Sequence, residues 1–306
     1  MLAWASVREC PLSVCGVFWV GRRFWRRRAC GILRCPRMNA LTKITQHVYW
    51  MPPGPPDRPS LCAVLGERRT LMLDAGSSAA HARAFLDALM VASGARPSAV
   101  IYTHAHWDHV LGGAEIGGLV IAHTLTAERL TELAQRDWSD EALDKRVAAG
   151  LSSADHAADV KAEMPSPRTV EIAPADIVFH EGIEIDLGGV TVSARHVGGD
   201  HSADSSLMYV EPDRALFMGD CFSASPAGVM TPESVSRLRE VILGSAAEHY
   251  IEGHHESVSS RGEIEALFEK ARLAERAARE GSAIDAPDED TEYFLQAFRA
   301  GLGVTS

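Results

Sequence analysis

The segment 103–109 holds three histidines and one aspartate within six residues: His104, His106, Asp108 and His109. His104 and His106 are two positions apart, so an extended backbone points both imidazole rings to the same side. Asp108 and His109 follow where the chain is expected to turn into a helix, and there they can face the same point. Neutral imidazole and carboxylate are ligands that zinc and iron prefer, so the spacing predicts a metal site.

Three further candidate ligands each follow a short apolar, strand-like run. They are His201, Asp220 and His254. With the residues of the first motif they make seven candidates, which is enough for two metal ions. We expect one ion to bind His104, His106 and His201. We expect a second ion to bind Asp108, His109 and His254, with Asp220 bridging the two.

The elements that must position these residues alternate between strand and helix from Met38 onward, which is typical of an α/β fold. Leu61 to Leu65 and Thr70 to Leu73 read as a hairpin that ends at Asp74. The spacing of Phe85, Leu86 and Leu89 predicts a helix from Ala79 to Ser93 that stops at Gly94. The next strand, 99–102, leads directly into the first motif, and 176–218 returns to strands.

Two stretches read as helical without any strand pattern. The first, 124–163, is expected to be an insert outside both sheets that forms part of the pocket wall, as a lid or as a homodimer contact. Leu130 and Trp138 are expected to supply its apolar contacts. The second comprises C-terminal helices over about 259–301, opened by a capping box at Ser260 and Glu263.

In this order the motifs resemble those of the metallo-β-lactamase superfamily of hydrolases, with a glyoxalase II-like set. The matching residues are Asp74, the HxHxDH motif at 104–109, His201, Asp220 and His254. The resemblance covers about 45–275. It implies an α/β fold that is a four-layer αββα sandwich of two mixed β-sheets with helices outside, and a dinuclear site at one edge. The third motif departs from the pattern with Asp200 before His201, and His255 directly follows His254, so His255 is an alternative ligand.

A dinuclear site of this kind favours hydrolysis. Two divalent ions give a charge of +4, and Asp108, Asp220 and a bridging hydroxide reduce it to +1, which attracts negative charge. Metal binding lowers the pKa of water to about 7, and the second ion polarises a carbonyl. We expect two Zn²⁺, with Fe or Mn as alternatives, acting on a small ester, thioester, lactone or lactam. Asp108 and Asp74 are the catalytic candidates, and Asp74 would orient a metal-bound histidine.

Alternative interpretations remain open at this stage. A mono-iron persulfide dioxygenase-like enzyme of the same fold would use only His104, His106 and Asp220 around its iron. Cys221, beside Asp220, is either a thiolate ligand or a packing residue, and the second interpretation is favoured because neighbouring residues of a strand point to opposite faces. His196 could lie near the metals but reads as a strand residue. Six other histidines have no partner pattern and are expected to be structural or on the surface: His47, His81, His123, His156, His180 and His249.

Charge and cysteine usage change sharply near residue 37. Residues 1–37 carry eight of the 30 basic and one of the 41 acidic residues, which leaves 22 basic and 40 acidic residues, a net charge of −18, for 38–306. We expect 1–37 to be a non-domain extension and 38–306 to be the domain. So acidic a domain excludes nucleic acid and membrane surfaces as partners and favours a small-molecule substrate. Only Cys62 and Cys221 remain in it, which fits a reducing, cytoplasmic location.

Overall fold

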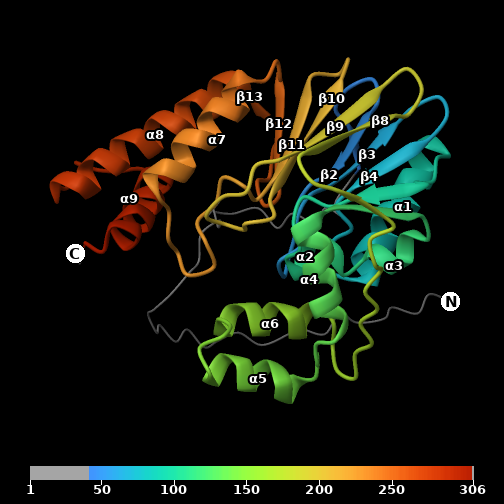
Figure 1. Cartoon of the computed structure of the whole chain (residues 1–306), viewed down its shortest axis with the longest axis horizontal. Coiled ribbons are helices and arrows are strands. Elements are labelled where there is room, and N and C mark those ends of the chain that lie inside the picture. Colours follow the sequence, from blue (N-terminus) through green and yellow to red (C-terminus); the bar gives the residue numbers. More distant parts are fainter. Residues whose placement is uncertain (1–40, 305–306) are drawn as a thin grey trace, which may run out of the picture. The chain divides into compact units, whose positions relative to one another are not determined.

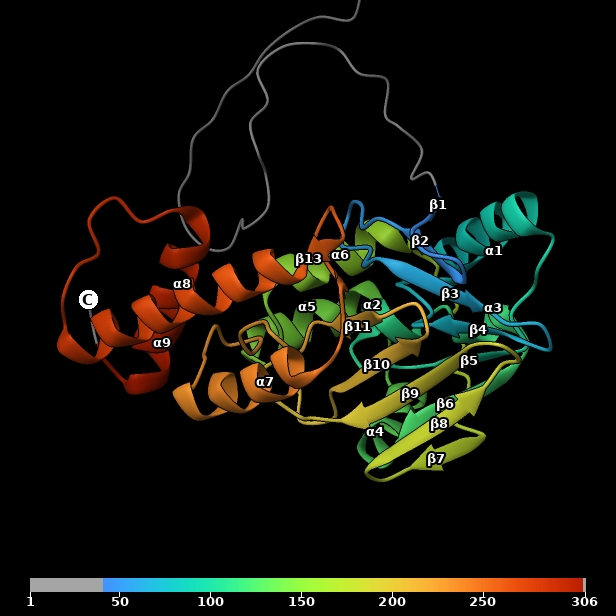
Figure 2. The same ribbon diagram turned by 90° about the horizontal axis from the view of Figure 1, so that it is seen from above.

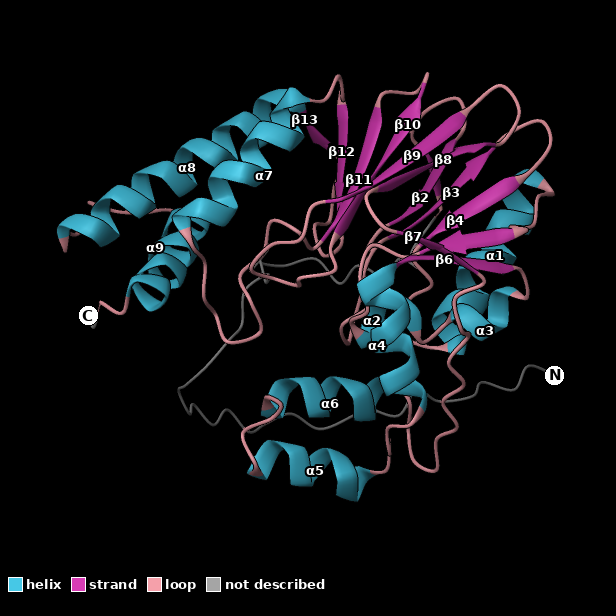
Figure 3. Cartoon of the chain, in the orientation of Figure 1, coloured by secondary structure: helices cyan, strands magenta, loops and turns pink. Residues whose placement is uncertain are grey.

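Residues 41–304 are described by the computed structural model of the chain, and their strands form two mixed β-sheets. Helices lie on the outer face of each sheet (Figure 1, Figure 3). This is the four-layer αββα sandwich that the sequence predicted. The extension expected at 1–37 and the start expected at Met38 lie outside the described residues.

The first sheet changes from antiparallel to parallel pairing at its centre. Neighbours from β1 to β4 are antiparallel, and neighbours from β4 to β7 are parallel. In spatial order its strands are β1 (Thr42–Lys43), β2 (Val48–Met51), β3 (Leu61–Leu65), β4 (Thr70–Leu73), β5 (Ala99–Ile101), β6 (Leu119–His123) and β7 (Ile177–Phe179). The helices packed with it are α1 (Ala79–Ser93), α2 (Trp107–Val110), α3 (Gly113–Ile116), α4 (Thr124–Ala134), α5 (Asp140–Ala148) and α6 (Ala154–Glu163).

The second sheet is antiparallel except where β11 meets β12 in parallel. In spatial order its strands are β13 (Ser259–Ser260), β12 (His249–Glu252), β11 (Ala215–Gly219), β10 (Ser206–Glu211), β9 (Thr191–His196) and β8 (Gly182–Asp186). Its outer face packs against α7 (Pro232–Gly244), α8 (Arg261–Glu280) and α9 (Glu289–Leu302), which Figure 2 shows on the side away from β2 to β6.

Alternation of side chains along the strands produces three separate apolar layers. In β11, Ala215 and Phe217 point into the layer between the sheets, whereas Leu216 and Met218 point toward α7 and α8. Strand β3 behaves in the same way, with its odd-numbered residues toward α1 and its even-numbered residues toward the other sheet. Because side chains of a strand alternate between its faces, a sheet covered on both sides needs apolar residues at nearly every position.

Local signals in the sequence predicted several elements correctly. Helix α1 spans Ala79–Ser93 and ends at Gly94 in the left-handed conformation, and α8 begins with the predicted capping box. Strand β6 and helix α7 were not predicted. A signal for α7 was present, because Thr231 caps its first turn, Pro232 occupies the first helical position, and Leu238 and Ile242 follow at helical spacing.

The two sheets are tied together at a turn by one buried carboxylate. Asp213, between β10 and β11, accepts hydrogen bonds from the Thr45 hydroxyl and from the His47 amide at 2.7 Å, and the His47 Nδ1 lies 2.7 Å from it. Burial alone would raise the pKa of Asp213, but its bonds to Thr45 and His47 hold the pKa below its usual value. The folded state therefore favours the ionised form.

Replacing Asp213 with Ala should lower the free energy of unfolding by about 1.5–3 kcal/mol, the range for hydrogen bonds to a charged group. Because the folded pKa is depressed, this contribution is present above the unfolded value and is lost as the pH falls through the folded value. Urea unfolding at pH 7 and at pH 3 checks both statements. Asp186→Ala is the control, since Asp186 pairs with Arg68 while both side chains are more than 60% exposed, and such pairs contribute little. Equal effects of the two substitutions would contradict the prediction.

Candidate metal centre

The candidate ligands follow the carboxyl ends of strands from both sheets. Strands β4 and β5 lead into Asp74 and His104, and strands β11 and β12 lead into Asp220 and His254. Backbone hydrogen bonds join these strand ends, from Ser206 to Thr103 at 2.8 Å and from Gly253 to Gly219 at 2.9 Å. The parallel pairs β4–β5 and β11–β12 thus place their exits at one edge of the sandwich, where ligands of open α/β sheets generally bind.

A short helix sets the direction of the first motif. His106 is the extended residue that precedes α2, and Asp108 and His109 lie within the helix. The chain therefore turns sharply after His106, which is how four side chains from six residues come to face one region. Trp107, between them, is only 5% exposed and packs in the apolar layer behind the site, so it does not line a pocket.

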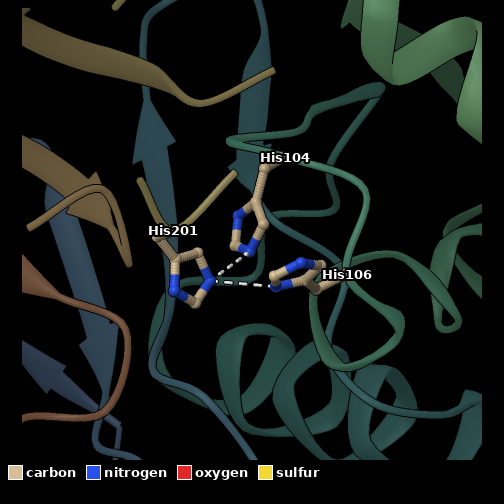
Figure 4. A group of neighbouring side chains, drawn as sticks. All are labelled: His104, His106 and His201. Carbon is tan, nitrogen blue, oxygen red and sulfur yellow. Dashed lines mark hydrogen bonds between the residues drawn. The ribbon is translucent and has the colours of Figure 1, made fainter. Parts of the chain in front are cut away.

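His104, His106 and His201 form the first group, here called the histidine group. The His201 Nε2 lies 3.2 Å from the His104 Nε2 and 2.9 Å from the His106 Nδ1, so three ring nitrogens converge on one point (Figure 4). Zinc–nitrogen bonds of about 2.0–2.1 Å in a tetrahedral site separate their ligand atoms by about 3.3 Å. The spacing of the three nitrogens is therefore close to that of a zinc site.

Asp108, His109, Asp220 and His254 form the second group, here called the carboxylate group. The Asp108 Oδ2 lies 3.1 Å from the His254 Nε2 and 3.3 Å from the His109 Nε2. The Asp220 Oδ2 lies 3.4 Å from the His109 Nε2 and 3.3 Å from the His254 Nε2. It is also 3.6 Å from the His201 Nε2 of the histidine group, so a single oxygen is within reach of both groups.

The two groups differ in their protonation. Burial, followed by the neighbouring imidazoles, lowers the pKa of His104 well below its usual value and that of His106 to about 4. Burial also lowers the pKa of His201. At neutral pH these three rings are uncharged, which leaves a nitrogen lone pair on each for a cation.

In the carboxylate group the aspartates together affect the pKa values of the two histidines more than burial does. Burial alone would lower the pKa of His109 and of His254, but Asp108 and Asp220 raise both well above the usual value. Burial alone would raise the pKa of Asp220, but His254 and His109 hold it well below the usual value. Two anions are thus balanced by two protons, and a divalent cation can replace those protons.

Backbone and carboxylate partners fix the ring nitrogens that face away from the two groups. The His109 Nδ1 lies 2.7 Å from the Asp74 Oδ2, and the His201 Nδ1 lies 3.1 Å from the Ala224 carbonyl. Asp74 also accepts hydrogen bonds from the Thr103 amide and hydroxyl, and its own backbone is left-handed with φ 58°. Asp74 therefore lies where the sequence analysis expected an orienting carboxylate, behind a candidate ligand and outside both groups.

Glycine is required where the carboxylate group is closest to the backbone. A Cβ on Gly253 would lie 2.0 Å from the Asp220 Oδ1 and 3.2 Å from the His109 Cε1, and a Cβ on Gly219 would overlap Thr103. Within residues 41–304 neither the Asp220 Oδ1 nor the His109 Nε2 has a hydrogen-bond partner. A buried imidazole nitrogen without a hydrogen-bond partner, with histidine and aspartate donors around it, fits a bound metal ion.

The structure brings all seven candidate ligands together, whereas the two alternative ligands, His255 and Cys221, lie outside both groups. His255 is half-buried and its Nδ1 contacts the Ser257 carbonyl, so His254 and not His255 joins the carboxylate group. Cys221 is a buried free thiol whose pKa is raised by burial, and it packs among the apolar residues near α7. The seven residues come from four separate segments of the chain, and the structure places them in two groups.

Sequence reasoning missed two carboxylates beside the site. The Asp57 Oδ1 lies 3.6 Å from the His254 Nδ1, and burial with the nearby Asp108 raises the pKa of Asp57 to about 7. Asp204 bonds to the amide of Ala105, between His104 and His106. Asp57 follows a proline-rich loop without any pattern, so only the fold brings it to His254. Asp204 follows His201 by three residues, and this closeness was the one available signal.

Fold and site together define an αββα protein with a histidine and aspartate centre at one edge of its sheets. The model of the metallo-beta-lactamase superfamily matches residues 55–270, and the chain belongs to this superfamily. No curated protein sequence matches the chain significantly.

Several solved structures share the fold at low sequence identity. A metallo-beta-lactamase from Pontibacter korlensis is 16% identical, with a TM-score of 0.51 over 75% of this chain and 96% of that one. The stereoselective inverting sec-alkylsulfatase Pisa1 from Pseudomonas sp. is 14% identical, with a TM-score of 0.58 over 87% of this chain and 51% of its own. A Cronobacter sakazakii metallo-beta-lactamase is 18% identical, with a TM-score of 0.50 over 85% and 92% of the two chains. These likenesses support the fold.

Gly253→Ala should displace the Asp220 carboxylate, because the added methyl group has no room beside it. We expect the protein to fold but to lose at least one bound metal ion, measured as metal content after dialysis against a weak chelator. Gly262→Ala in α8 is the matched control, since nothing lies within 4 Å of the added carbon there. Full metal content in Gly253→Ala would show that the carboxylate tolerates displacement and would contradict the prediction.

Proposed function

We propose that this protein is a dinuclear metal-dependent hydrolase with two zinc ions, acting on a small ester, thioester, lactone or lactam. The observation that carries the proposal is the Asp220 Oδ2, which lies within 3.6 Å of imidazole nitrogens from both groups. A carboxylate in that place would help to hold both ions. The histidine group and the carboxylate group would each hold one ion. Bound there, the ions would supply a hydroxide nucleophile at neutral pH and polarise the scissile carbonyl.

The chain's own residues prepare the site for this chemistry. Asp74 accepts a hydrogen bond from the Nδ1–H of His109, and this leaves the His109 Nε2 as the nitrogen that would act as a ligand. The Ala224 carbonyl does the same for His201. Asp108 and Asp220 offset the charge of the ions, and their near-complete burial keeps bulk water away from them.

The proposal includes the setting in which the enzyme works. A net charge of −18 over residues 38–306 favours a small substrate over nucleic acid or an anionic membrane. None of the helices within 41–304 is long and apolar enough to span a membrane. Cys62 and Cys221 are both buried free thiols, which supports a reducing compartment such as the cytoplasm.

His106→Ala and Asp220→Ala should each reduce kcat/KM by more than about 100-fold, since loss of a direct ligand exceeds the usual effect of losing an outer partner. The substrate panel should contain thioesters, lactones, β-lactams and, because an alkylsulfatase shares the fold, sulfate esters. Zinc content of the same samples should fall from two ions per chain. His255→Ala is the control, because its side chain lies outside both groups, and it should keep activity and metal.

The same variants distinguish the dinuclear hydrolase from the alternative enzyme, a persulfide dioxygenase. A mono-iron persulfide dioxygenase would carry a single iron and consume oxygen with a persulfide substrate. It would also tolerate loss of His254, which belongs only to the carboxylate group. Oxygen uptake by wild-type protein, or full activity in Asp220→Ala, would therefore contradict the dinuclear hydrolase.

We also propose that α6 forms a wall of the substrate pocket. His156, Asp159 and Glu163 lie on one face of this helix. The His156 ring packs edge-on against Trp107 at 5.7 Å, next to Asp108, and burial with nearby Asp155 and Asp108 raises the pKa of Asp159. In Figure 1 and Figure 2, α6 lies beside α2, which carries part of the site.

Leu130 and Trp138 do not supply this wall, contrary to the sequence analysis. They are 1% and 7% exposed and pack inside the apolar layer of the first sheet. Helical spacing predicted that they are apolar contacts but could not tell whether those contacts face a substrate or the core. Replacing either with Ala would therefore cost stability and would not test selectivity.

His156→Ala should change KM by about two- to tenfold, the effect of one hydrogen bond of ~0.5–1.5 kcal/mol, and leave the zinc content at two. Ala158→Gln, on the opposite, exposed face of the same helix, is the matched control and should leave KM unchanged. Michaelis–Menten kinetics with the best substrate of the panel measures both. Unaltered KM and substrate preference in His156→Ala would reject α6 as a pocket wall.

A further inference from the structure

A second buried carboxylate, Asp204, lies behind the histidine group. Its side chain is fully buried, and it forms no ion pair with any residue in the described range 41–304. It accepts three hydrogen bonds instead, from the Ser202 hydroxyl at 2.5 Å, from the Ala105 amide at 2.9 Å and from the Thr126 hydroxyl at 2.9 Å. A buried anion without a cationic partner is costly, so these three donors must compensate for its burial.

Two of the three donors belong to the loops that carry the histidine group. Ala105 is the residue between His104 and His106, and Ser202 directly follows His201. Both oxygens of Asp204 are used, with Oδ1 on the Ser202 loop and Oδ2 on the Ala105 loop. The carboxylate therefore connects the two segments whose ring nitrogens converge.

We propose that Asp204 is a positioning residue that holds the histidine group in its converged geometry, an inference that rests on the proposed metal-dependent function. Its role parallels that of Asp74, which contacts the His109 ring of the carboxylate group. Asp74 contacts a ring nitrogen in addition to the Thr103 amide and hydroxyl, whereas Asp204 contacts only backbone and hydroxyl groups. A buried aspartate thus lies behind each of the two groups.

The expected effect of replacing Asp204 follows from the three groups that donate hydrogen bonds to it. The Ser202 and Thr126 hydroxyls can rotate to other acceptors, but the Ala105 amide is fixed in the peptide between two candidate ligands. Without an acceptor this amide is buried and unsatisfied, so the loop must shift to satisfy it. A shift there moves His104 and His106 relative to His201, whereas no residue of the carboxylate group bonds to Asp204.

The test measures zinc affinity in full-length protein, by competition with a chromophoric chelator at pH 7. In Asp204→Ala we expect one of the two zinc affinities to fall by about 10–100-fold, as for other outer partners of metal ligands, while the other stays at the wild-type value. Two double variants identify the weakened site. Asp204→Ala with His201→Ala should retain one tight zinc ion, and Asp204→Ala with His254→Ala should retain none.

Thr126→Val is the control that separates positioning from packing, because it removes only the bond from Asp204 to α4. Both zinc affinities should stay at the wild-type value in this variant, and a loss equal to that in Asp204→Ala would overturn the proposal. Asp204→Asn provides a second test if Asp204→Ala fails to fold. Asparagine keeps the volume and one acceptor oxygen, so we expect a smaller loss at the same zinc site.

The outcomes distinguish this inference from the function on which it rests. Wild-type protein that does not bind two zinc ions would overturn the proposed function and this inference with it. Two zinc ions in the wild type, combined with equal weakening of both sites or of neither in the Asp204 variants, would overturn the role of Asp204 alone. Selective loss at the histidine group would support it.

Discussion

The burial of four aspartates at one edge of the sandwich is the constraint on which the rest of the site depends. Asp74 and Asp204 are fully buried, and Asp108 and Asp220 are less than a tenth exposed. Burying an unpaired carboxylate costs several kcal/mol, so each must find protons, donors or a cation. Asp74 and Asp204 are satisfied by donors of the chain itself. Asp108 and Asp220 are left with imidazoles whose protons a metal ion can replace, which is why the edge can select a divalent cation.

Residues from both sheets surround these carboxylates. The backbone at the site therefore has a left-handed residue at Asp74 and a glycine at position 253. Asp74 adopts a left-handed conformation at the end of β4, which turns its carboxylate back toward Thr103 and His109. Gly253, at the end of β12, leaves room for the Asp220 carboxylate. Such strained or side-chain-free positions are tolerated because the sandwich behind them is rigid, with apolar side chains filling all three layers.

The sequence predicted what is encoded over short distances and missed what only the fold brings together. The strand-like run from Leu61 to Leu65, the capping box of α8 and the spacing from His104 to His109 are local, and the structure has all of them. The bond between Ala105 and Asp204 spans 99 positions, and Asp57 is 197 positions from His254 in the chain. No periodicity encodes such a pair. For the same reason helical spacing identified Leu130 and Trp138 as apolar contacts but could not show that both face the core, Leu130 from α4 and Trp138 from the loop between α4 and α5.

The contacts that hold α6 are separate from the contacts that hold the candidate ligands. Glu163, at the end of α6, bonds to Arg58 at 2.8 Å and to the Ser78 hydroxyl that precedes α1. These contacts join the helix to the loop that carries Asp57 and to the start of α1, and none of them involves a candidate ligand. The face with His156 and Asp159 can therefore vary in sequence while the anchor at Glu163 and the ligands stay unchanged. If α6 forms the proposed wall, a fold built in this way can change its substrate and keep the same candidate metal centre, because the residues that fix the wall and the residues that fix the centre are different ones.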